Sequence, residues 1–208
     1  MLVVAFLSLC SRQVLFAQQQ STGCYAAVTA DFAERDKLPE SGIAPSRWIK
    51  MKDWGPAAAK YPAVSVPACA DSVEWRRRRI IAVAEKYIGL SYRHHHIPAW
   101  HTAKIAAGLD CSNFTAWVYN YGLGIKFTSN ISEQSDGPLA PGRKLGRDEK
   151  LEPGDLLYIM KKDRSRVSHV VIFVDEGHII DSHAEGVRIR EFKGWYKTHF
   201  SHARRIVE

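Results

Sequence analysis

Hydrophobic residues recur with a helical period in two stretches of the middle of the chain. The first stretch runs from Asp71 to Gly89 and opens with Ser72 and Glu74, which are typical of a capped helix N-terminus. Its apolar positions predict a buried face made of Trp75, Ile80, Val83, Ala84, Tyr87 and Ile88. We expect the Arg76–Arg79 run to be a solvated surface and not a nucleic-acid site, because consecutive helical residues point in different directions.

The second helical stretch begins at Cys111 and is closed by Gly122 and Gly124. Its apolar residues fall at i, i+3, i+4 and i+7, which predicts an amphipathic helix with one apolar face. These residues are Phe114, Trp117, Val118 and Tyr121. Cys111 would stand at the helix N-terminus, where free N–H groups and the macrodipole favour an anion. The position therefore favours a thiolate and predicts a nucleophile.

The pattern changes from helical to strand-like in the last third of the chain. Ser132-Glu133-Gln134 and Pro138–Gly142 are expected to form a polar connection. Apolar and β-branched runs with close turns between them then predict an antiparallel sheet or small barrel. These runs cover residues 156–160, 169–174, 178–182, 187–192 and 203–207. Helices followed by strands predict an α+β domain over residues 71–208.

The first 70 residues divide into two parts. Residues 1–17 contain a short apolar run at positions 2–9, and three glutamines follow Ala17, so we predict a signal peptide cleaved after Ala17. A buried N-terminal helix is the alternative, since Arg12 interrupts the apolar sequence and no Lys or Arg precedes it. Residues 18–70 are rich in proline and form an N-terminal extension to which the sequence assigns no role.

Charge and cysteine content bear on the kind of partner and on the cellular compartment. The 208 residues include 29 Lys and Arg against 22 Asp and Glu, and the net charge of +7 suits an anionic partner such as a cell-wall polymer, a membrane surface or nucleic acid. No nucleic-acid motif is present, and after residue 17 no apolar run approaches the ~20 residues of a membrane span. Cys24 and Cys69 either pair outside the cytoplasm or are separate buried thiols, and both alternatives stay open.

A histidine is available as a base for Cys111. His169 opens a predicted strand, and Asp181, twelve residues later on the neighbouring strand, has the parity to share its face. His183 has the same parity, and a tight turn would place it directly opposite His169 with Asp181 on the diagonal. We favour Asp181 as the residue that orients His169, because a carboxylate stabilises an imidazolium through a charge-assisted hydrogen bond.

Four histidines lie within residues 94–101, between the two helices. Their spacing matches no zinc motif, so no metal is expected. We expect this segment to be a loop beside the catalytic site, with side chains that contact the substrate.

From about Ser72 to Val207 the chain resembles the NlpC-type cell-wall peptidases, a papain-like family of bacterial cysteine hydrolases. The matching segments, beside Tyr92, are Asp110–Phe114 (family pattern D-C-S-G-F), Leu151–Leu156 (P-G-D-L), Ser168–Phe173 (H-V-G-I-Y), Gly186-Val187 and His202–Arg205. The chain departs from the pattern at three places. Asn113 replaces a glycine, His94–His96 with an insertion replace a Gly-Gly pair, and Asp181 stands where the family usually has a histidine.

The resemblance implies a papain-like α+β fold and a cysteine peptidase with Cys111, His169 and Asp181 as its catalytic residues. Tyr92 would line the site and bind the oxyanion together with the Cys111 N–H. Further substrate contacts are expected from His94, Ser112 and His183. The implied substrate is a peptidoglycan stem peptide, cut beside a D-glutamyl or diaminopimelyl residue.

The resemblance leaves room for two rival functions. One is a cysteine amidase or acyltransferase on the same fold, and the other is a non-catalytic wall-binding module. A pure binder needs no nucleophile, so the combination of Cys111, His169 and Asp181 favours an enzyme. We expect a monomer without cofactor, metal or nucleic-acid partner, exported to the periplasm or cell envelope or secreted.

Overall fold

The computed structural model describes residues 23–37, 60–92, 109–146 and 148–208, so the predicted signal peptide lies outside the described residues. The helices are η1 (Ala27–Thr29, a 3-10 turn), α2 (Phe32–Lys37), α4 (Ser72–Lys86), α5 (Cys111–Leu123), α6 (Ile131–Asp136) and α7 (Trp195–Thr198). The strands are β1 (Arg143–Lys144), β2 (Leu156–Met160), β3 (Val167–Asp175), β4 (His178–His183), β5 (Gly186–Glu191) and β6 (Phe200–Arg205). They form one antiparallel sheet in the order β1-β6-β2-β3-β4-β5, which confirms the predicted α+β class.

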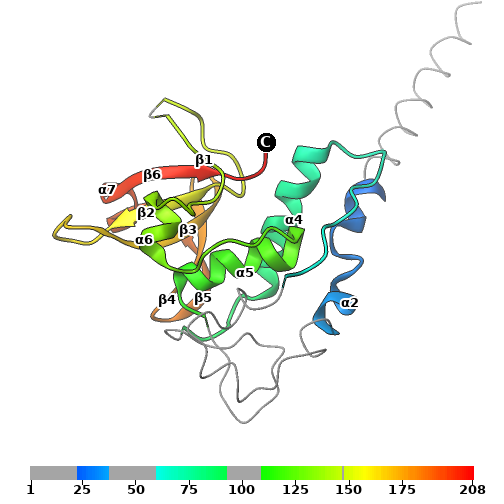
Figure 1. Ribbon diagram of the computed structural model, residues 1–208. Helices are drawn as coiled ribbons and strands as arrows, with labels where there is room; N and C mark the ends of the chain where they lie inside the picture. The colour runs from blue at the N-terminus through cyan, green and yellow to red at the C-terminus, as the bar shows by residue number, and fades with distance from the viewer. Residues whose placement is uncertain (1–22, 38–59, 93–108, 147) are drawn as a thin grey trace, which may run out of the picture.

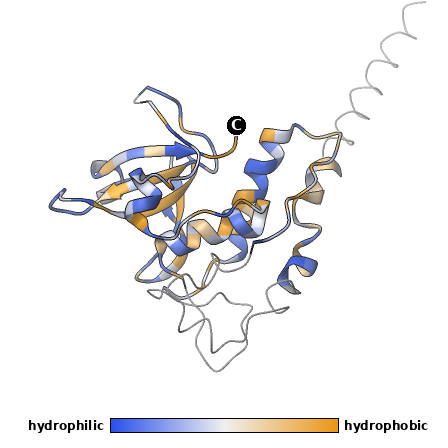
Figure 2. Cartoon of the chain, in the orientation of Figure 1, coloured by the Kyte–Doolittle hydropathy of each residue, from blue (hydrophilic) through white to orange (hydrophobic). Residues whose placement is uncertain are grey.

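The main helices form a layer on one face of the sheet, with α5 between the strands and α4 (Figure 1). Alternate strand residues such as Leu156, Val170 and Ile180 pack with these two helices, whereas their neighbours Leu157 and Val171 belong to a second cluster. Side chains alternate between the two faces of a strand, so the central strands are buried on both sides. Figure 2 shows the hydrophobic colours gathered on the strands and α5, with blue stretches along α4.

Helix α5 is defined by its two caps. The Asp110 side chain accepts a hydrogen bond from the Asn113 N–H at 2.8 Å, and Gly124 ends the helix in the left-handed conformation with φ 71°. A side chain at Gly124 would meet the backbone of residues 61–63 at under 3 Å. The predicted apolar face is confirmed, since its four residues all belong to the main core cluster, but the other side of the helix is buried as well. The helix is enclosed because it lies between two other layers.

Helix α4 begins at the predicted place, since the Asp71 carboxylate accepts the Glu74 N–H at 2.8 Å. Two expectations about its surface are wrong. Ile88 falls beyond the end of the helix and is 47% exposed. Arg79 is only 1% exposed, because its guanidinium donates to the carbonyl oxygens of Gly122 and Val28 at 2.5 Å each and to Asp31 Oδ1 at 2.6 Å.

The described part of the N-terminal extension packs against the helical layer. Cys24 and Cys69 form a disulfide, which decides between the two alternatives. Arg35, 4% exposed, donates to the Tyr121 carbonyl at 2.7 Å and to the Pro62 carbonyl at 2.8 Å. Arg79 and Arg35 thus join the extension to α4 and α5 through buried hydrogen bonds.

Several short elements escaped the sequence pattern. Helix α6 occupies part of the expected polar connection, and Asn130 caps it by accepting the N–H groups of Ser132 and Glu133. A helix of one or two turns carries too few apolar positions to show a period, which also explains why η1, α2 and α7 were missed. Strand β6 begins at Phe200, three residues before its predicted start. None of the helices within the described ranges is long and apolar enough to cross a membrane.

Candidate active site

Cys111 is the first residue of α5 and is 7% exposed. It is the free cysteine among the described residues, since Cys24 and Cys69 are paired. The first N–H groups of a helix have no partner within the helix, so Cys111 stands where positive partial charge gathers. The Asp110 carboxylate fixes this turn, because its Oδ1 also accepts from Asn113 Nδ2 at 2.9 Å and from the Ser112 hydroxyl at 3.3 Å.

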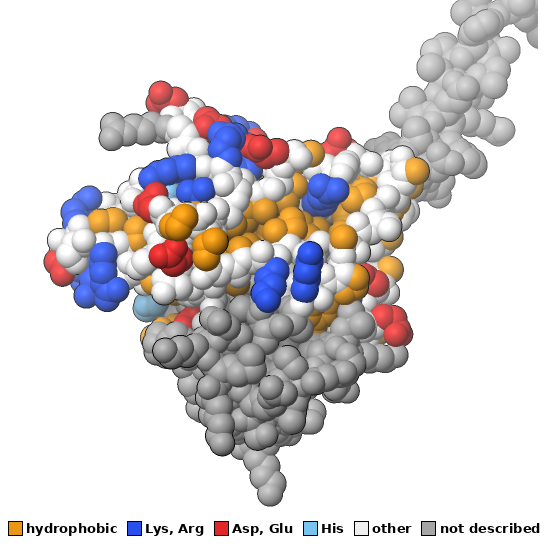
Figure 3. Space-filling view, viewed as in Figure 1, with side chains coloured by type: hydrophobic (Ala, Val, Ile, Leu, Met, Phe, Trp, Pro, Cys, Tyr) orange, Lys and Arg blue, Asp and Glu red, His pale blue; other side chains and the backbone are white. Residues whose placement is uncertain are grey.

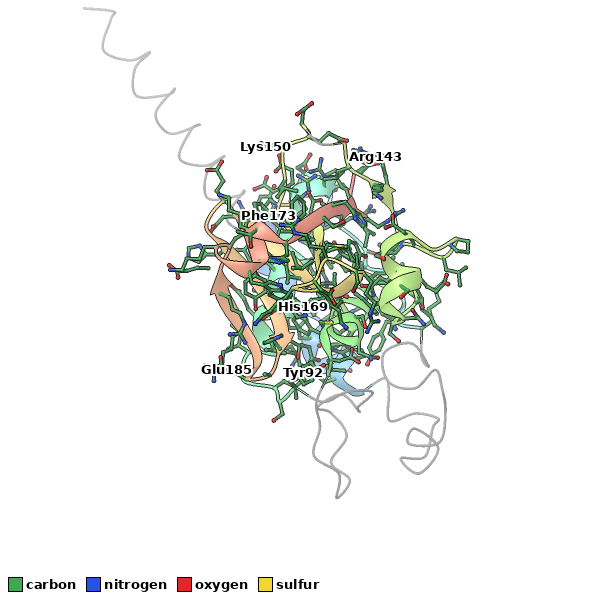
Figure 4. All side chains as sticks on the ribbon, turned by 90° about the vertical axis from the view of Figure 1, so that its left-hand side faces the viewer. Tyr92, Arg143, Lys150, His169, Phe173 and Glu185 are labelled. Atoms are coloured by element: carbon green, nitrogen blue, oxygen red, sulfur yellow. A yellow bond between two sulfur atoms is a disulfide. The ribbon has the colours of Figure 1, made fainter. Side chains whose placement is uncertain are left out.

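His169 lies near the start of β3, in the middle of the molecule in Figure 4. The ladder between β2 and β3 pairs Ile159 with His169 and Met160 with Val167, so one extra residue bulges from β3 next to the histidine. Such a bulge twists a strand locally and re-aims the neighbouring side chain. His169 is 4% exposed, and its Nε2 lies 2.6 Å from Asp181 Oδ2.

The strand register explains how Asp181 reaches His169. Strands β3 and β4 pair Ile172 with Ile180, and three further steps along each strand would place position 169 opposite position 183. Asp181 is therefore a diagonal neighbour, as the tight-turn alternative predicted. His183, the direct neighbour, holds its ring edge-on to His169 with centroids 5.1 Å apart.

The protonation of His169 is set by its two neighbours. Burial disfavours the charged imidazolium, but the negative charge of Cys111 and the hydrogen bonds to Asp181 and Cys111 outweigh it and raise the pKa of His169 to about 9. Because Nε2 faces Asp181, the other ring nitrogen, Nδ1, is the one left for Cys111. At neutral pH the arrangement places an imidazolium between Cys111 and the Asp181 carboxylate.

Asp181 has partners that the sequence analysis did not anticipate. The carboxylate is fully buried; its Oδ1 accepts from Arg190 Nε at 2.7 Å, and its Oδ2 also accepts from the Tyr196 hydroxyl at 2.8 Å. Burial alone would raise the pKa of Asp181, but the bonds from His169, Arg190 and Tyr196 lower it. The rings of Trp195 and Tyr196 lie 5.6 and 5.9 Å from the His169 ring and cover it from α7.

Gln134 of α6 is a second residue that was missed, having been assigned to a polar connection. It is fully buried, and its Nε2 donates to the Ser112 carbonyl at 3.2 Å and the Thr128 carbonyl at 2.9 Å. Its Oε1 accepts from Thr115 Oγ1 at 3.1 Å. The amide thus holds the first turn of α5, directly behind Cys111.

The remaining expected site residues have different surroundings. Tyr92 is 37% exposed, and burial together with the negative charges of Cys111 and Asp110 raises its pKa, so its hydroxyl keeps a proton to donate. Ser112 is 5% exposed and its hydroxyl points to Asp110. His183 lies beside His169 and is classed as exposed. Its ring is nevertheless partly shielded from water, and this shielding together with the His169 charge lowers the pKa of His183. His94 lies outside the described residues.

The chain is similar to a known protein family and to individual proteins of known name. The model of the NlpC/P60 family matches residues 92–205. The gamma-DL-glutamyl hydrolase of Bacillus subtilis is 27% identical over 182 residues, which are 85% of this chain and 40% of that protein. The "Probable endopeptidase p60" of Listeria grayi is 30% identical over 115 residues, 55% of this chain and 20% of that protein. The chain therefore spans less than half the length of either relative.

Two solved structures show the same fold. An NlpC/P60 family protein of Bacillus cereus matches 71% of this chain and 42% of its own with a TM-score of 0.54 and 23% identity. The peptidoglycan hydrolase RipB of Mycobacterium tuberculosis matches 93% of this chain and 86% of its own with a TM-score of 0.53 and 16% identity. The predicted papain-like fold is thereby confirmed. Since the family model covers more than half of the 208 residues, the chain belongs to the NlpC/P60 family.

Proposed function

We propose that this protein is a cysteine peptidase that hydrolyses peptide bonds in the stem peptides of bacterial peptidoglycan, beside a D-glutamyl or diaminopimelyl residue. The observation that carries the proposal is the buried imidazole of His169, bonded at 2.6 Å to Asp181 and interacting with Cys111 at a helix N-terminus. A nucleophile, a base and an orienting carboxylate in contact are what covalent acyl transfer requires. Family membership and the names of the relatives, two hydrolases and an endopeptidase, support the same chemistry.

In the proposed reaction Cys111 Sγ attacks the carbonyl carbon of the scissile amide and gives a tetrahedral intermediate. His169 then donates its Nδ1 proton to the leaving amine, and the acyl group stays on Cys111 as a thioester. The neutral His169 next takes a proton from water, which attacks the thioester and releases the acid. Asp181 holds the ring in the required orientation through both steps.

The oxyanion needs donors near Cys111. The Cys111 N–H and the protonated hydroxyl of Tyr92 are the proposed pair, because one lies at a helix N-terminus and the other is coupled electrostatically to Cys111. His94 and His183 are proposed to contact the substrate. Ser112 is proposed to do so through its backbone, since its hydroxyl is used by Asp110.

We further propose that the protein acts outside the cytoplasm, with residues 1–17 as its signal peptide, residues 18–70 as an extension and residues 71–208 as the catalytic domain. The disulfide between Cys24 and Cys69 supports this location, because such bonds persist in oxidising compartments. The net charge of +7 suits an anionic wall polymer. Lys and Arg side chains are spread over the face seen in Figure 3 and do not gather in one patch, so the charge acts over a wide surface.

The test is digestion of purified muropeptides followed by mass spectrometry. We expect a mass gain of one water per cleavage and a new amine terminus next to the D-glutamyl or diaminopimelyl residue, with no product from Cys111→Ala. Transfer of the acyl group to an added amine without hydrolysis would instead identify an acyltransferase. Binding of the polymer with no covalent product from any muropeptide would identify a wall-binding module.

A further inference from the structure

The carboxylate of Asp181 is held by more than His169. Its Oδ1 accepts from Arg190 Nε at 2.7 Å, and its Oδ2 accepts from the Tyr196 hydroxyl at 2.8 Å beside the 2.6 Å contact with His169 Nε2. Arg190 comes from β5 and Tyr196 from α7, so the two bonds approach from different directions. With both oxygens occupied, the fully buried carboxylate cannot turn away from His169 without breaking a hydrogen bond.

The charges along this line alternate in sign. In the active form they are the Cys111 thiolate, the His169 imidazolium, the Asp181 carboxylate and the Arg190 guanidinium, which sum to zero. Arg190 reaches the surface, where its Nη1 lies 3.0 Å from Glu185 Oε2 and the Glu185 side chain is 61% exposed. Without Arg190 the three inner groups would carry a net charge of −1 in a site where each side chain is at most 7% exposed. An uncompensated buried charge is strongly disfavoured.

Building on the proposed function, we infer that Arg190 and Tyr196 are positioning residues of the catalytic site. Both hold the Asp181 carboxylate against His169, and Arg190 also balances its charge, so that a thiolate and a buried carboxylate can exist on either side of one imidazolium.

Arg190 is the fixed cation of this cluster among the described residues. The titratable and charged groups around His169 are Cys111 of α5, Asp181 and His183 of β4, Arg190 of β5 and Tyr196 of α7, with Tyr92 and Asp110 next to Cys111. His183 adds no charge at neutral pH, because burial and the His169 charge lower its pKa. Arg188 is paired with Asp181 across the β4–β5 ladder, but its side chain is 55% exposed and forms its ion pair with Glu185, at 3.6 Å, and not with Asp181, which makes it the matched control.

The experiment compares Arg190→Gln, Arg190→Lys, Tyr196→Phe and Arg188→Gln with the wild-type full chain. Two readouts need no peptide: the pH dependence of Cys111 alkylation by iodoacetamide, and the NMR titration of the His169 ring. Loss of a fixed positive charge makes the neighbouring groups keep their protons to higher pH. Arg190→Gln should therefore move both midpoints upward by roughly one pH unit. Arg190→Lys should keep the wild-type midpoints, because its charge is retained.

Tyr196→Phe removes a hydrogen bond to Asp181 without changing any charge, so it tests the orientation of the Asp181 carboxylate alone. Its midpoints should stay at the wild-type values, while kcat on muropeptides falls roughly tenfold at unchanged KM, because the phenol acts through Asp181 and not on the substrate. Arg188→Gln should match the wild type in all three measurements. A structural role for Arg190 alone would lower the thermal midpoint and leave the titrations in place.

Three results would overturn the inference: unchanged midpoints in folded Arg190→Gln, an equal shift in Arg188→Gln, or full kcat in Tyr196→Phe. If Arg190→Gln does not fold, Arg190→Lys decides, since a displaced midpoint with the charge retained contradicts charge balance. A wild-type protein that alkylates and titrates as expected but releases no peptide from muropeptides would refute the proposed function and leave this inference standing.

Discussion

Replacement of Asp181 by alanine should lower kcat at least ~100-fold, and the structure shows where the loss arises. The pKa of His169 is about 9 against an ordinary 6.5, which corresponds to about 3 kcal/mol of extra stability of the imidazolium. Cys111 and Asp181 share this stabilisation of the imidazolium. If Asp181 supplies about half, its loss removes about 2 kcal/mol, which is more than a factor of ten in the equilibrium constant between the ion pair and the neutral pair. Loss of the 2.6 Å bond that orients the ring adds roughly another factor of ten.

His183→Ala is the control, because His183 lies on the same strand and its ring is 5.1 Å from that of His169. It is exposed and meets the imidazole through a ring contact and not a hydrogen bond, so its removal should change kcat by less than ~3-fold. Both variants are assayed by mass spectrometry of muropeptide release at several substrate concentrations, with circular dichroism to establish folding. The reverse ranking, with His183→Ala the more damaging, would refute the assignment and move the orienting role to His183.

Other predictions follow from the same contacts. Cys111→Ala should abolish wall hydrolysis with the fold intact, and Cys111→Ser should keep at most a trace. Activity should fall as the pH rises through about 9, since His169 then lacks the proton for the leaving amine; a pH–rate profile checks this. Arg79→Met should lower the free energy of unfolding in urea by about 3 kcal/mol, and Arg78→Met, at an exposed position, by less than about 0.5. Gln134→Leu should reduce kcat roughly tenfold and stability by about 2 kcal/mol, since the Ser112 carbonyl loses its donor.

The features that were predictable are those with a local signal. Asp71 stands directly before α4 and Asp110 directly before α5. Each caps its helix, which is the usual role of an aspartate that precedes an apolar repeat. The strands after residue 150 showed apolar runs between close turns, and five of the six strands fall where those runs lie. Parity alone brought position 181 to the face of His169, because side chains alternate along paired strands.

The features that were missed depend on contacts between distant segments. Arg79 looked like one of four surface arginines, yet its partners are Val28 and Asp31 in the extension and Gly122 at the end of α5. A helical period shows which way a side chain points but not which other segment lies there. The buried position of Arg79 therefore follows from the docking of the extension, which has no periodicity of its own.

Strand parity alone does not decide between Asp181 and His183, so the choice depends on the chemistry of the two side chains. Parity put both residues on the face of His169, and the register made His183 the direct neighbour. What favours Asp181 is the stabilisation that only a carboxylate gives an imidazolium, and that stabilisation is useful in a buried site only if the carboxylate has a second cation. Arg190 meets this condition from the next strand, nine residues along the chain. Residues 187–192 were predicted as a strand without a partner for Arg190, so the counter-ion was present in the sequence but could be recognised only once the burial of Asp181 was known.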